Sequence, residues 1–270
     1  MKNKIGLGVI TCNKPDRLAQ SIKTVPGDDY IDCLVIVNDG EPYDNSLYPK
    51  GAHVIQHETN KCVGPSKNDA LRYLIDQGCS HLFIMEDDIL IKDPGVFTQY
   101  IKTAQATGIW HLNYGYHGPA NKDADDRPNP RCIIEYRDGI KIALNQHIVG
   151  AFSYYYKGVI DNRGYIDEQY NNAWDHVDHT YQIIKAGLHP PFWWFADTSN
   201  SCEYLEDLDS DLSDSSIRQN QDEWISNLKE GAEHYKRKHG WIPVQTPQAD
   251  IQQVQAELRN ISAKYSREVL

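Results

Sequence analysis

Long apolar runs are missing from this sequence of 270 residues. A membrane-spanning helix needs roughly 20 consecutive apolar residues, and no segment approaches that length. The first residues, MKNKIGLGVITCN, lack the small-residue cleavage site of a signal peptide, so we expect them to form a first strand. Internal repeats and low-complexity tracts are also missing. We therefore expect a soluble cytoplasmic protein, with peripheral attachment to the inner membrane as the alternative.

Paired cysteines and an excess of positive charge are missing as well. The six cysteines form no CxxC pair, so neither a metal cluster nor a disulfide framework is indicated. The net charge of −11 argues against general affinity for nucleic acid. One basic segment, residues 233–241 (EHYKRKHGW), is most simply the solvated face of a helix. Its alternative role is contact with a polyanionic acceptor or a membrane surface.

The first half of the chain alternates between apolar runs and helical patterns. Strands are predicted at residues 4–13, 32–40, 53–57 and 81–91, and helices at residues 14–25 and 64–78. Strands and helices that alternate over short links are typical of an α/β protein with a mostly parallel sheet flanked by helices.

The second half is less regular, and its elements divide the chain. We predict one domain over residues 1–215 and a helical C-terminal extension over residues 216–270. The elements expected there are a hairpin at residues 132–160 turning at Asp138-Gly139, a helix at 171–187, a strand at 189–197, an acidic loop at 198–216, and helices at 222–240 and 250–270.

Polar side chains follow three of the predicted strands where each strand ends. These segments are Thr11-Cys12-Asn13, Asn38-Asp39-Gly40 and Glu86-Asp87-Asp88. Because parallel strands end at one edge of a sheet, we expect the three segments to lie together and to line a ligand site. The acidic triplet could be a solvated or ion-paired turn. Its position instead favours a divalent cation, Mg²⁺ or Mn²⁺, held by oxygen ligands as a diphosphate clamp.

With these segments in view, the first half resembles the nucleotide-diphospho-sugar transferases with the GT-A fold, more narrowly their inverting family 2 type. The motifs that carry the resemblance are TCNKPDRLAQSI (residues 11–22), VIVNDG (35–40), NKCVGPSKNDAL (60–71) and IMEDDI (84–89). The resemblance implies a Rossmann-like GT-A sheet. Residues 1–110 would then bind the nucleotide sugar, and residues 111–215 would bind the acceptor.

The resemblance also implies roles for single residues. Asp88 would be the ligand of Mn²⁺ or Mg²⁺ in a D-x-D-type motif, and Asp197 is a candidate supplementary ligand. Lys67 stands where an arginine is common in the family. The residues expected to bind the donor are Thr11, Asn13, Arg17, Asp39, Gly64, Lys67, Asn68, Glu86 and Asp87.

A second group of functional candidates starts the helix at residues 171–187. Asp175, Asp178 and His179 share one helix face, which could simply place acids near the helix dipole. A His/Asp metal site is a further alternative that we disfavour, because His176 is expected to point elsewhere. By the resemblance, Asp175 is the general base that deprotonates the acceptor, with Asp178 as the second candidate.

The segment GAFSYYY, residues 150–156, has two interpretations. It is either a β-strand with an aromatic face, or a glycine-bearing loop followed by tyrosines that stack on sugars. His147, just before it, could contact a phosphate or the acceptor, whereas Trp193 and Trp194 are expected to pack in the core.

Together these features predict a metal-dependent inverting glycosyltransferase that uses a nucleotide sugar, most simply a UDP-sugar. The expected acceptor is a hydroxyl group of a bacterial surface glycan, and the alternative is a phage-type enzyme that glycosylates hydroxymethylated DNA. A nucleotidyltransferase is disfavoured because TCNKPDR lacks its glycine-rich signature. A non-catalytic nucleotide- or sugar-binding module is the rival from another class.

Overall fold

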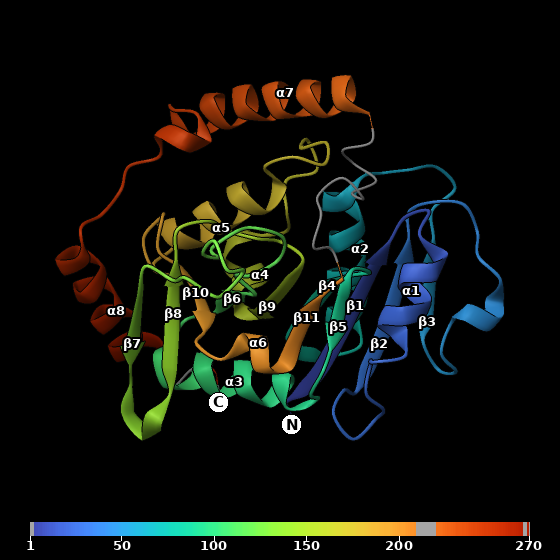
Figure 1. Cartoon of the computed structure of the whole chain (residues 1–270), viewed down its shortest axis with the longest axis horizontal. Helices are drawn as coiled ribbons and strands as arrows, with labels where there is room; N and C mark the ends of the chain where they lie inside the picture. The colour runs from blue at the N-terminus through green and yellow to red at the C-terminus, as the bar shows by residue number, and fades with distance from the viewer. Residues whose placement is uncertain (1–2, 209–219, 267–268, 270) are drawn as a thin grey trace.

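The computed structural model describes residues 3–208, 220–266 and 269, and its centre is a six-stranded sheet (Figure 1). The strand order is β3-β2-β1-β4-β9-β6, and β9 runs in the direction opposite to the other five strands. This arrangement confirms the predicted α/β class with a mostly parallel sheet. The strands are β1 (Lys4–Thr11), β2 (Cys33–Asn38), β3 (His53–Gln56), β4 (Cys79–Glu86), β6 (His111–Asn113) and β9 (Phe152–Tyr156).

Helices cover both faces of the sheet and follow the strands closely in sequence. The helix α1 begins at Pro15, whose fixed φ suits a first helical position. The helix α2 lies against β1, β2 and β4 and buries Ala70, Leu71 and Leu74. The helices of this part are α1 (Pro15–Ile22), α2 (Val63–Asp76), α3 (Gly95–Thr107), α4 (Gly158–Arg163), α5 (Asp175–Lys185) and α6 (Ser201–Tyr204).

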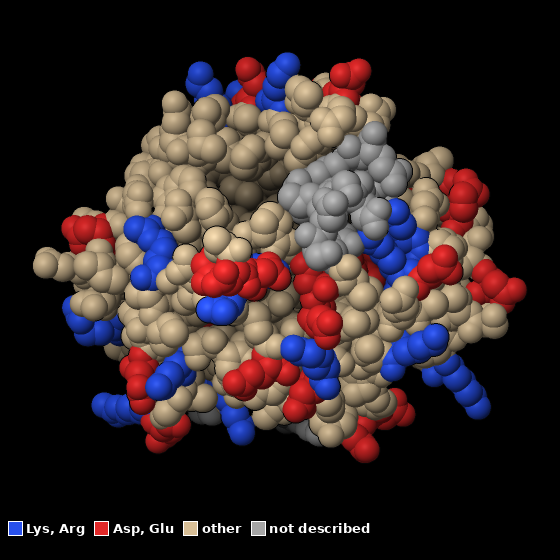
Figure 2. Space-filling view, in the orientation of Figure 1, with Lys and Arg blue, Asp and Glu red and all other residues tan. Residues whose placement is uncertain are grey.

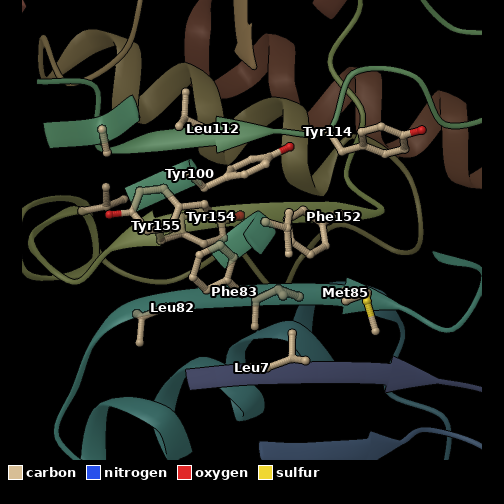
Figure 3. Close-up of a cluster of buried hydrophobic side chains, with 14 of the residues drawn as sticks. Leu7, Leu82, Phe83, Met85, Tyr100, Leu112, Tyr114, Phe152, Tyr154 and Tyr155 are labelled. Atoms are coloured by element: carbon tan, nitrogen blue, oxygen red, sulfur yellow. The ribbon is translucent and has the colours of Figure 1, made fainter. Parts of the chain in front are cut away.

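Aromatic side chains fill the core between the sheet and α3. Phe83 of β4 meets Phe97 of α3 edge to face, with their ring centroids 4.8 Å apart. Tyr154 of β9 points into the same core, with its ring centroid 5.1 Å from that of Phe83, whereas Tyr155 points to the opposite face and stacks on His111. The two tyrosines are 0% and 3% exposed (Figure 3). The strand interpretation of residues 150–156 is therefore confirmed, and these two tyrosines do not stack on a bound sugar.

Two small antiparallel sheets complete the fold. The first has the order β10-β8-β7, from β7 (Cys132–Glu135), β8 (Lys141–Asn145) and β10 (Phe195–Thr198). Its hairpin turns where predicted, because Asp138 and Gly139 both adopt positive φ, 62° and 75°. The second pairs β5 (Ile89–Ile91) with β11 (Leu205–Asp207).

The β5–β11 pair corrects two predictions from the sequence. Residues 81–91 are not one strand, because the chain turns at Asp87 and Asp88 and leaves the main sheet. The expected acidic loop at 198–216 contains α6 and β11 in its described part, and residues 209–216 lie outside the described residues.

The two predicted C-terminal helices are confirmed as α7 (Gln221–His239) and α8 (Ile251–Tyr265). The helix α8 packs against α3 and adds Val254, Leu258 and Ile261 to the main core. The helix α7 lies across one end of the molecule, above α5 and α2 in Figure 1. The boundary between residues 215 and 216 lies outside the described residues, so the division into domain and extension stays a prediction. None of the described helices is long and apolar enough to cross a membrane.

Candidate active site

Two adjoining cavities lie at the carboxyl ends of the parallel strands, where open α/β sheets bind ligands. We call the first, of about 500 Å³, the strand-end cavity, since Thr11, Asp39 and Asp87 line it at or just past the ends of β1, β2 and β4. We call the second, of about 520 Å³, the helix cavity, since Asp175 and His176 of α5 line it. Figure 2 shows the surface hollowed below α7 on this side of the molecule.

The acidic turn after β4 forms the wall that the two cavities share. Glu86 and Asp88 line both cavities. Asn13 and Arg17, two of the residues expected to bind the donor, line the strand-end cavity on the other side of that wall. The tertiary structure therefore brings the three polar strand ends together.

Glu86 forms an ion pair with the buried side chain of Lys67. The Lys67 Nζ lies 2.7 Å from Glu86 Oε1 and donates a 3.0 Å hydrogen bond to the Gly150 carbonyl oxygen. Burial lowers the pKa of Lys67, but Glu86 and then Asp175 outweigh burial and raise it above its ordinary value. Burial raises the pKa of Glu86, but Lys67 more than offsets this and leaves it below its ordinary value. Both groups are therefore charged at neutral pH.

Gly150 keeps the floor of the helix cavity open. A Cβ atom at this position would lie 3.1 Å from Lys67 Nζ and 3.1 Å from His176 Cγ, closer than most such contacts. A larger residue would push on both side chains. The glycine of GAFSYYY therefore lines the cavity, as the loop interpretation expected, although the segment after it is a strand.

Asp87 and Asp88 have different surroundings although they are adjacent. Asp87 accepts a 2.5 Å hydrogen bond from the Thr11 hydroxyl at the end of β1. Asp88 is 9% exposed, and its Oδ2 lies 3.7 Å from His117 Nε2, while the other ring nitrogen of His117 lies 2.9 Å from Asp207 Oδ1. Burial lowers the pKa of His117, but Asp207 and Asp88 outweigh burial and raise it to about 9.

Asp39 is held rigidly at the bottom of the strand-end cavity. Its Oδ1 lies 2.6 Å from His57 Nδ1 and accepts a 2.7 Å hydrogen bond from the Lys61 backbone N–H. The opposite nitrogen of His57 lies 3.0 Å from Asp69 Oδ2. Asp39 is 3% exposed, and these contacts fix its carboxylate in one orientation.

Asp175 lines the helix cavity, and its carboxylate is buried. The residue is 2% exposed, and no hydrogen-bond partner for its Oδ2 is found among the residues the structure describes. Its Oδ1 lies 3.2 Å from His176 Nδ1. Burial raises the pKa of Asp175, but His176 and Lys67 outweigh burial and lower it below the ordinary value. The expectation that His176 points elsewhere is wrong, because the left-handed turn at Trp174 (φ 69°) starts α5 with both side chains in the cavity.

Gly64 and Asn68 lie in α2 but line neither cavity. Asn68 is fully buried, where its side chain accepts a 2.9 Å hydrogen bond from the Ile166 N–H and donates at 2.8 Å to the Ile166 carbonyl. A second donated bond of 2.9 Å reaches Glu168 Oε1. Asn68 therefore ties α2 to the segment before α5 and does not face the space for a donor.

Asp197 lies away from both cavities, in the core beside α3. It is 0% exposed and accepts hydrogen bonds from the Tyr100 and Ser201 hydroxyls, each at 2.6 Å. The backbone N–H groups of Gly115 and Thr198 donate to it as well, at 3.0 and 2.7 Å. Burial raises the pKa of Asp197 to about 7. Both carboxylate oxygens of Asp197 accept hydrogen bonds from these four donors in the core. The site that we propose therefore does not include Asp197.

Asp178 also lies outside the cavities, although it shares a helix with Asp175. It is 1% exposed, and its oxygens lie 2.6 Å from Lys238 Nζ and 2.6 Å from His239 Nε2 of α7. Lys238 also donates a 2.8 Å hydrogen bond to Asp167. The basic segment 233–241 is thus partly an anchor that holds α7 on α5, and Asp178 serves this anchor.

The α7 anchor predicts a pH-dependent stability. Burial raises the pKa of Asp167, but Lys238 and His234 outweigh burial and lower it from 3.8 to about 2. The stabilisation that the Asp167 carboxylate gives to the folded state is therefore present above pH 3.8, and it is lost as the pH falls towards 2. We expect Asp167→Asn to unfold about 1–2 kcal/mol more easily at pH 7, a value reduced for partial exposure. Urea denaturation at pH 7, 4 and 2.5 should show this difference shrinking.

The control for this measurement is Asp161→Asn, which removes an exposed partner of Lys157 on α4. Surface pairs of this kind contribute little, so it should change stability by less than about 0.5 kcal/mol at every pH. A difference between Asp167→Asn and the unmodified chain that stays constant from pH 7 to 2.5 would contradict the assignment.

Sequence reasoning missed several residues of the site. His117 and Asp207 were not singled out, and α7 was treated as a separate extension although Trp224 lines the helix cavity. One sequence feature could have indicated His117: it lies in a polar turn, NYGYHG (residues 113–118), directly after a short strand. From α7 and its N-cap, the residues that line the strand-end cavity are Asn220, Glu223 and Asn227.

Whether the site fits a divalent cation can be judged from its side chains. Within residues 3–208, 220–266 and 269, no group of three or more His, Cys, Asp or Glu residues is arranged to hold a metal by itself. Mg²⁺ and Mn²⁺ in phosphate sites typically take one or two carboxylates and complete their shell with substrate oxygens and water. Asp88 would fit that role, because it lies in the wall between the two cavities, where an ion could also reach substrate oxygens.

Comparison with known proteins gives a result only at the level of structure. No family model matches the sequence, and no curated protein matches it. The structure of S. aureus TarS 1–349 matches with a TM-score of 0.52 at 12% identity, over 99% of this chain and 83% of that one. Its complex with UDP-GlcNAc matches with a TM-score of 0.52 at 14% identity, over 96% and 79%. The chain covers 44% of a longer TarS structure.

A second solved structure gives the same result. The mannosyltransferase PcManGT from Pyrobaculum calidifontis, in complex with GDP-Man and Mn²⁺, matches with a TM-score of 0.55 at 9% identity, over 100% of this chain and 72% of that one. At sequence identities this low, the structural matches establish a shared fold. The chain has the GT-A-type fold of the nucleotide-sugar glycosyltransferases.

Proposed function

We propose that this protein is a metal-dependent, inverting glycosyltransferase that moves a sugar from a nucleotide-diphosphate donor to a hydroxyl group. The observation that carries the proposal is the arrangement of two cavities on either side of Glu86 and Asp88. Asp39 lines one cavity and Asp175 lines the other. A donor and an acceptor can therefore occupy neighbouring spaces and meet at the acidic wall.

The nucleotide belongs in the strand-end cavity. Asp39, whose carboxylate is fixed by His57 and Lys61, would accept hydrogen bonds from the uracil or ribose. A divalent cation held by Asp88 would neutralise charge on the leaving diphosphate. We take a UDP-sugar as the donor, and the TarS complexes with UDP and UDP-GlcNAc support that choice. The PcManGT complex makes GDP-mannose the second donor to test.

The acceptor belongs in the helix cavity, next to Asp175. Its hydroxyl oxygen would form a bond to the anomeric carbon while the bond from that carbon to the diphosphate oxygen breaks. The hydroxyl proton passes to Asp175 Oδ2, and the diphosphate leaves with the bonding electrons. The lowered pKa of Asp175 keeps it ionised and able to accept the proton. Because that pKa is not raised, the departing diphosphate must supply much of the driving force.

The side chains of the helix cavity favour a glycan over DNA as the acceptor. Lys67 is the only lysine or arginine among the described residues that line it, and Glu86 already neutralises Lys67. DNA binding depends on several lysine or arginine contacts to phosphates. Trp224, in the same cavity, offers an aromatic ring for a sugar to pack against.

Release of nucleoside diphosphate from a donor panel tests the proposed function. The protein is incubated with Mn²⁺ and UDP-glucose, UDP-galactose, UDP-GlcNAc or GDP-mannose, without an acceptor. We expect slow hydrolysis of at least one donor, because water can replace the acceptor, and we expect EDTA to stop it. Donor binding by calorimetry without any release would instead indicate a non-catalytic binding module.

A further inference from the structure

His117 holds a position that neither the sequence motifs nor the fold explains. It lies in the segment after β6, lines the helix cavity, and has a side chain that is 18% exposed. One ring nitrogen, Nδ1, lies 2.9 Å from Asp207 Oδ1. The other, Nε2, lies 3.7 Å from Asp88 Oδ2. The imidazole therefore lies between a carboxylate of the cavity wall and a second carboxylate behind it.

Three segments that are distant in sequence build this arrangement. β11 pairs with β5 so that Asp207 lies opposite Ile89, the residue that follows Asp88. The Leu208 N–H donates a 2.8 Å hydrogen bond to the Asp88 carbonyl oxygen and fixes the register. The Gly118 N–H donates to Asp207 Oδ2, which holds the segment with His117 against β11.

The distance between Asp88 Oδ2 and His117 Nε2 suits two ligands of one cation. Ligand atoms about 2.1 Å from Mg²⁺ or Mn²⁺ are roughly 3 Å apart when adjacent and roughly 4 Å apart when opposite. The observed 3.7 Å lies between these values, so small side-chain movements would allow both atoms to bind one ion. Histidines that bind metals commonly have a carboxylate beside their other ring nitrogen, and here Asp207 Oδ1 lies 2.9 Å from His117 Nδ1.

We propose that His117 Nε2 binds the same divalent cation as Asp88, and that Asp207 is the positioning residue that orients the imidazole. The proposal rests on the metal-dependent function proposed above, and it adds a second protein ligand to that site. The remaining ligands are diphosphate oxygens and water, as in other phosphate-bound cations. A nitrogen ligand also favours Mn²⁺ over Mg²⁺, because imidazole prefers transition metals.

A different role for His117 makes the opposite prediction. If His117 is only a positive counter-ion to Asp88, it repels a metal ion, and its removal should strengthen cation binding. If it is a ligand, its removal should weaken cation binding. The direction of the change in Mn²⁺ affinity therefore separates the two roles without any measurement of sugar transfer.

The experiment measures Mn²⁺ binding by electron paramagnetic resonance of the free ion, in the presence of saturating UDP. We expect His117→Ala to raise the Kd for Mn²⁺ by about 10- to 100-fold, and Asp207→Asn by about 10-fold. His117→Asn serves as a second variant in case His117→Ala does not fold, and thermal melting checks both. His53→Ala is the control, because His53 of β3 stacks on Tyr73 and lines neither cavity, and it should keep the Kd within about twofold.

Each outcome bears on a different claim. An unchanged or tighter Mn²⁺ affinity in folded His117→Ala and His117→Asn overturns the ligand assignment and leaves the proposed function standing. If the unmodified protein binds no Mn²⁺ with UDP, both the ligand assignment and the metal dependence fail. A ratio of Mn²⁺ to Mg²⁺ affinity that falls in His117→Ala supports the nitrogen ligand.

Discussion

Replacing Asp175 with asparagine should lower the turnover of sugar transfer by about 10²- to 10⁴-fold, the contribution typical of a general base. The amide cannot take the proton of the acceptor hydroxyl, although it has nearly the same shape and can keep a contact with His176 Nδ1. UDP binding in the presence of Mn²⁺ should stay within about twofold, because Asp175 lines the helix cavity and not the strand-end cavity. Turnover is measured from donor hydrolysis or transfer, and UDP affinity from calorimetry.

Two further variants make this result specific to Asp175. Asp161→Asn, an exposed replacement on α4, should keep normal turnover. Asp178→Asn should mainly lower thermal stability, since Asp178 is paired with Lys238 and His239 and lines neither cavity. Normal turnover in Asp175→Asn would remove Asp175 as the base. Turnover lost only in Asp178→Asn, with stability unchanged, would assign the base to Asp178 instead.

Replacing Asp88 with alanine should remove the gain in UDP affinity that Mn²⁺ provides. We expect the Kd for UDP in the presence of Mn²⁺ to rise by about 100-fold. Removing a residue that only orients a metal ligand already lowers metal affinity by about 10- to 100-fold, and Asp88→Ala removes the ligand itself. Binding without metal should change little. Calorimetric titrations of UDP with Mn²⁺ and with EDTA, on both proteins, give the four affinities that are needed.

Comparison of the two acidic variants tests the division of labour between the cavities. Asp175→Asn should lose turnover and keep Mn²⁺-dependent UDP binding, whereas Asp88→Ala should lose both. Equal UDP affinities in the presence and absence of Mn²⁺ for the unmodified protein would show that the donor binds without a cation. Full turnover in Asp88→Ala would contradict the assignment of Asp88 as the metal ligand.

The first half of the fold was predictable because its pattern is local. The strands β1, β2 and β4 are nearly continuous apolar runs, and such runs are typical of parallel strands buried on both faces. The polar residues after β1, β2 and β4 could be placed together without coordinates, because parallel strands end at the same edge. Asp39, Asp87 and Asp88 were found in this way, and all three line the cavities.

The acidic triplet shows where local pattern stops being informative. The sequence gives three adjacent carboxylates but not the turn that separates them. In the structure Glu86 ends β4 and pairs with Lys67, Asp87 faces Thr11, and Asp88 leads into β5. Their different surroundings follow from where α2 and β1 lie, and not from the order of the three residues.

The sequence by itself determined the α/β class, the edge of the sheet that carries the site, and the candidates Asp88 and Asp175. Only the tertiary structure decided that Asp178 anchors α7, that Asp197 is held by four internal donors, and that His117 lies beside Asp88. The physical reason is the range of the interactions. Strand ends follow from hydrophobic runs of a few residues, whereas the contacts of Asp88 with His117, Asp178 with Lys238 and Asp197 with Tyr100 join residues that are 29, 60 and 97 positions apart.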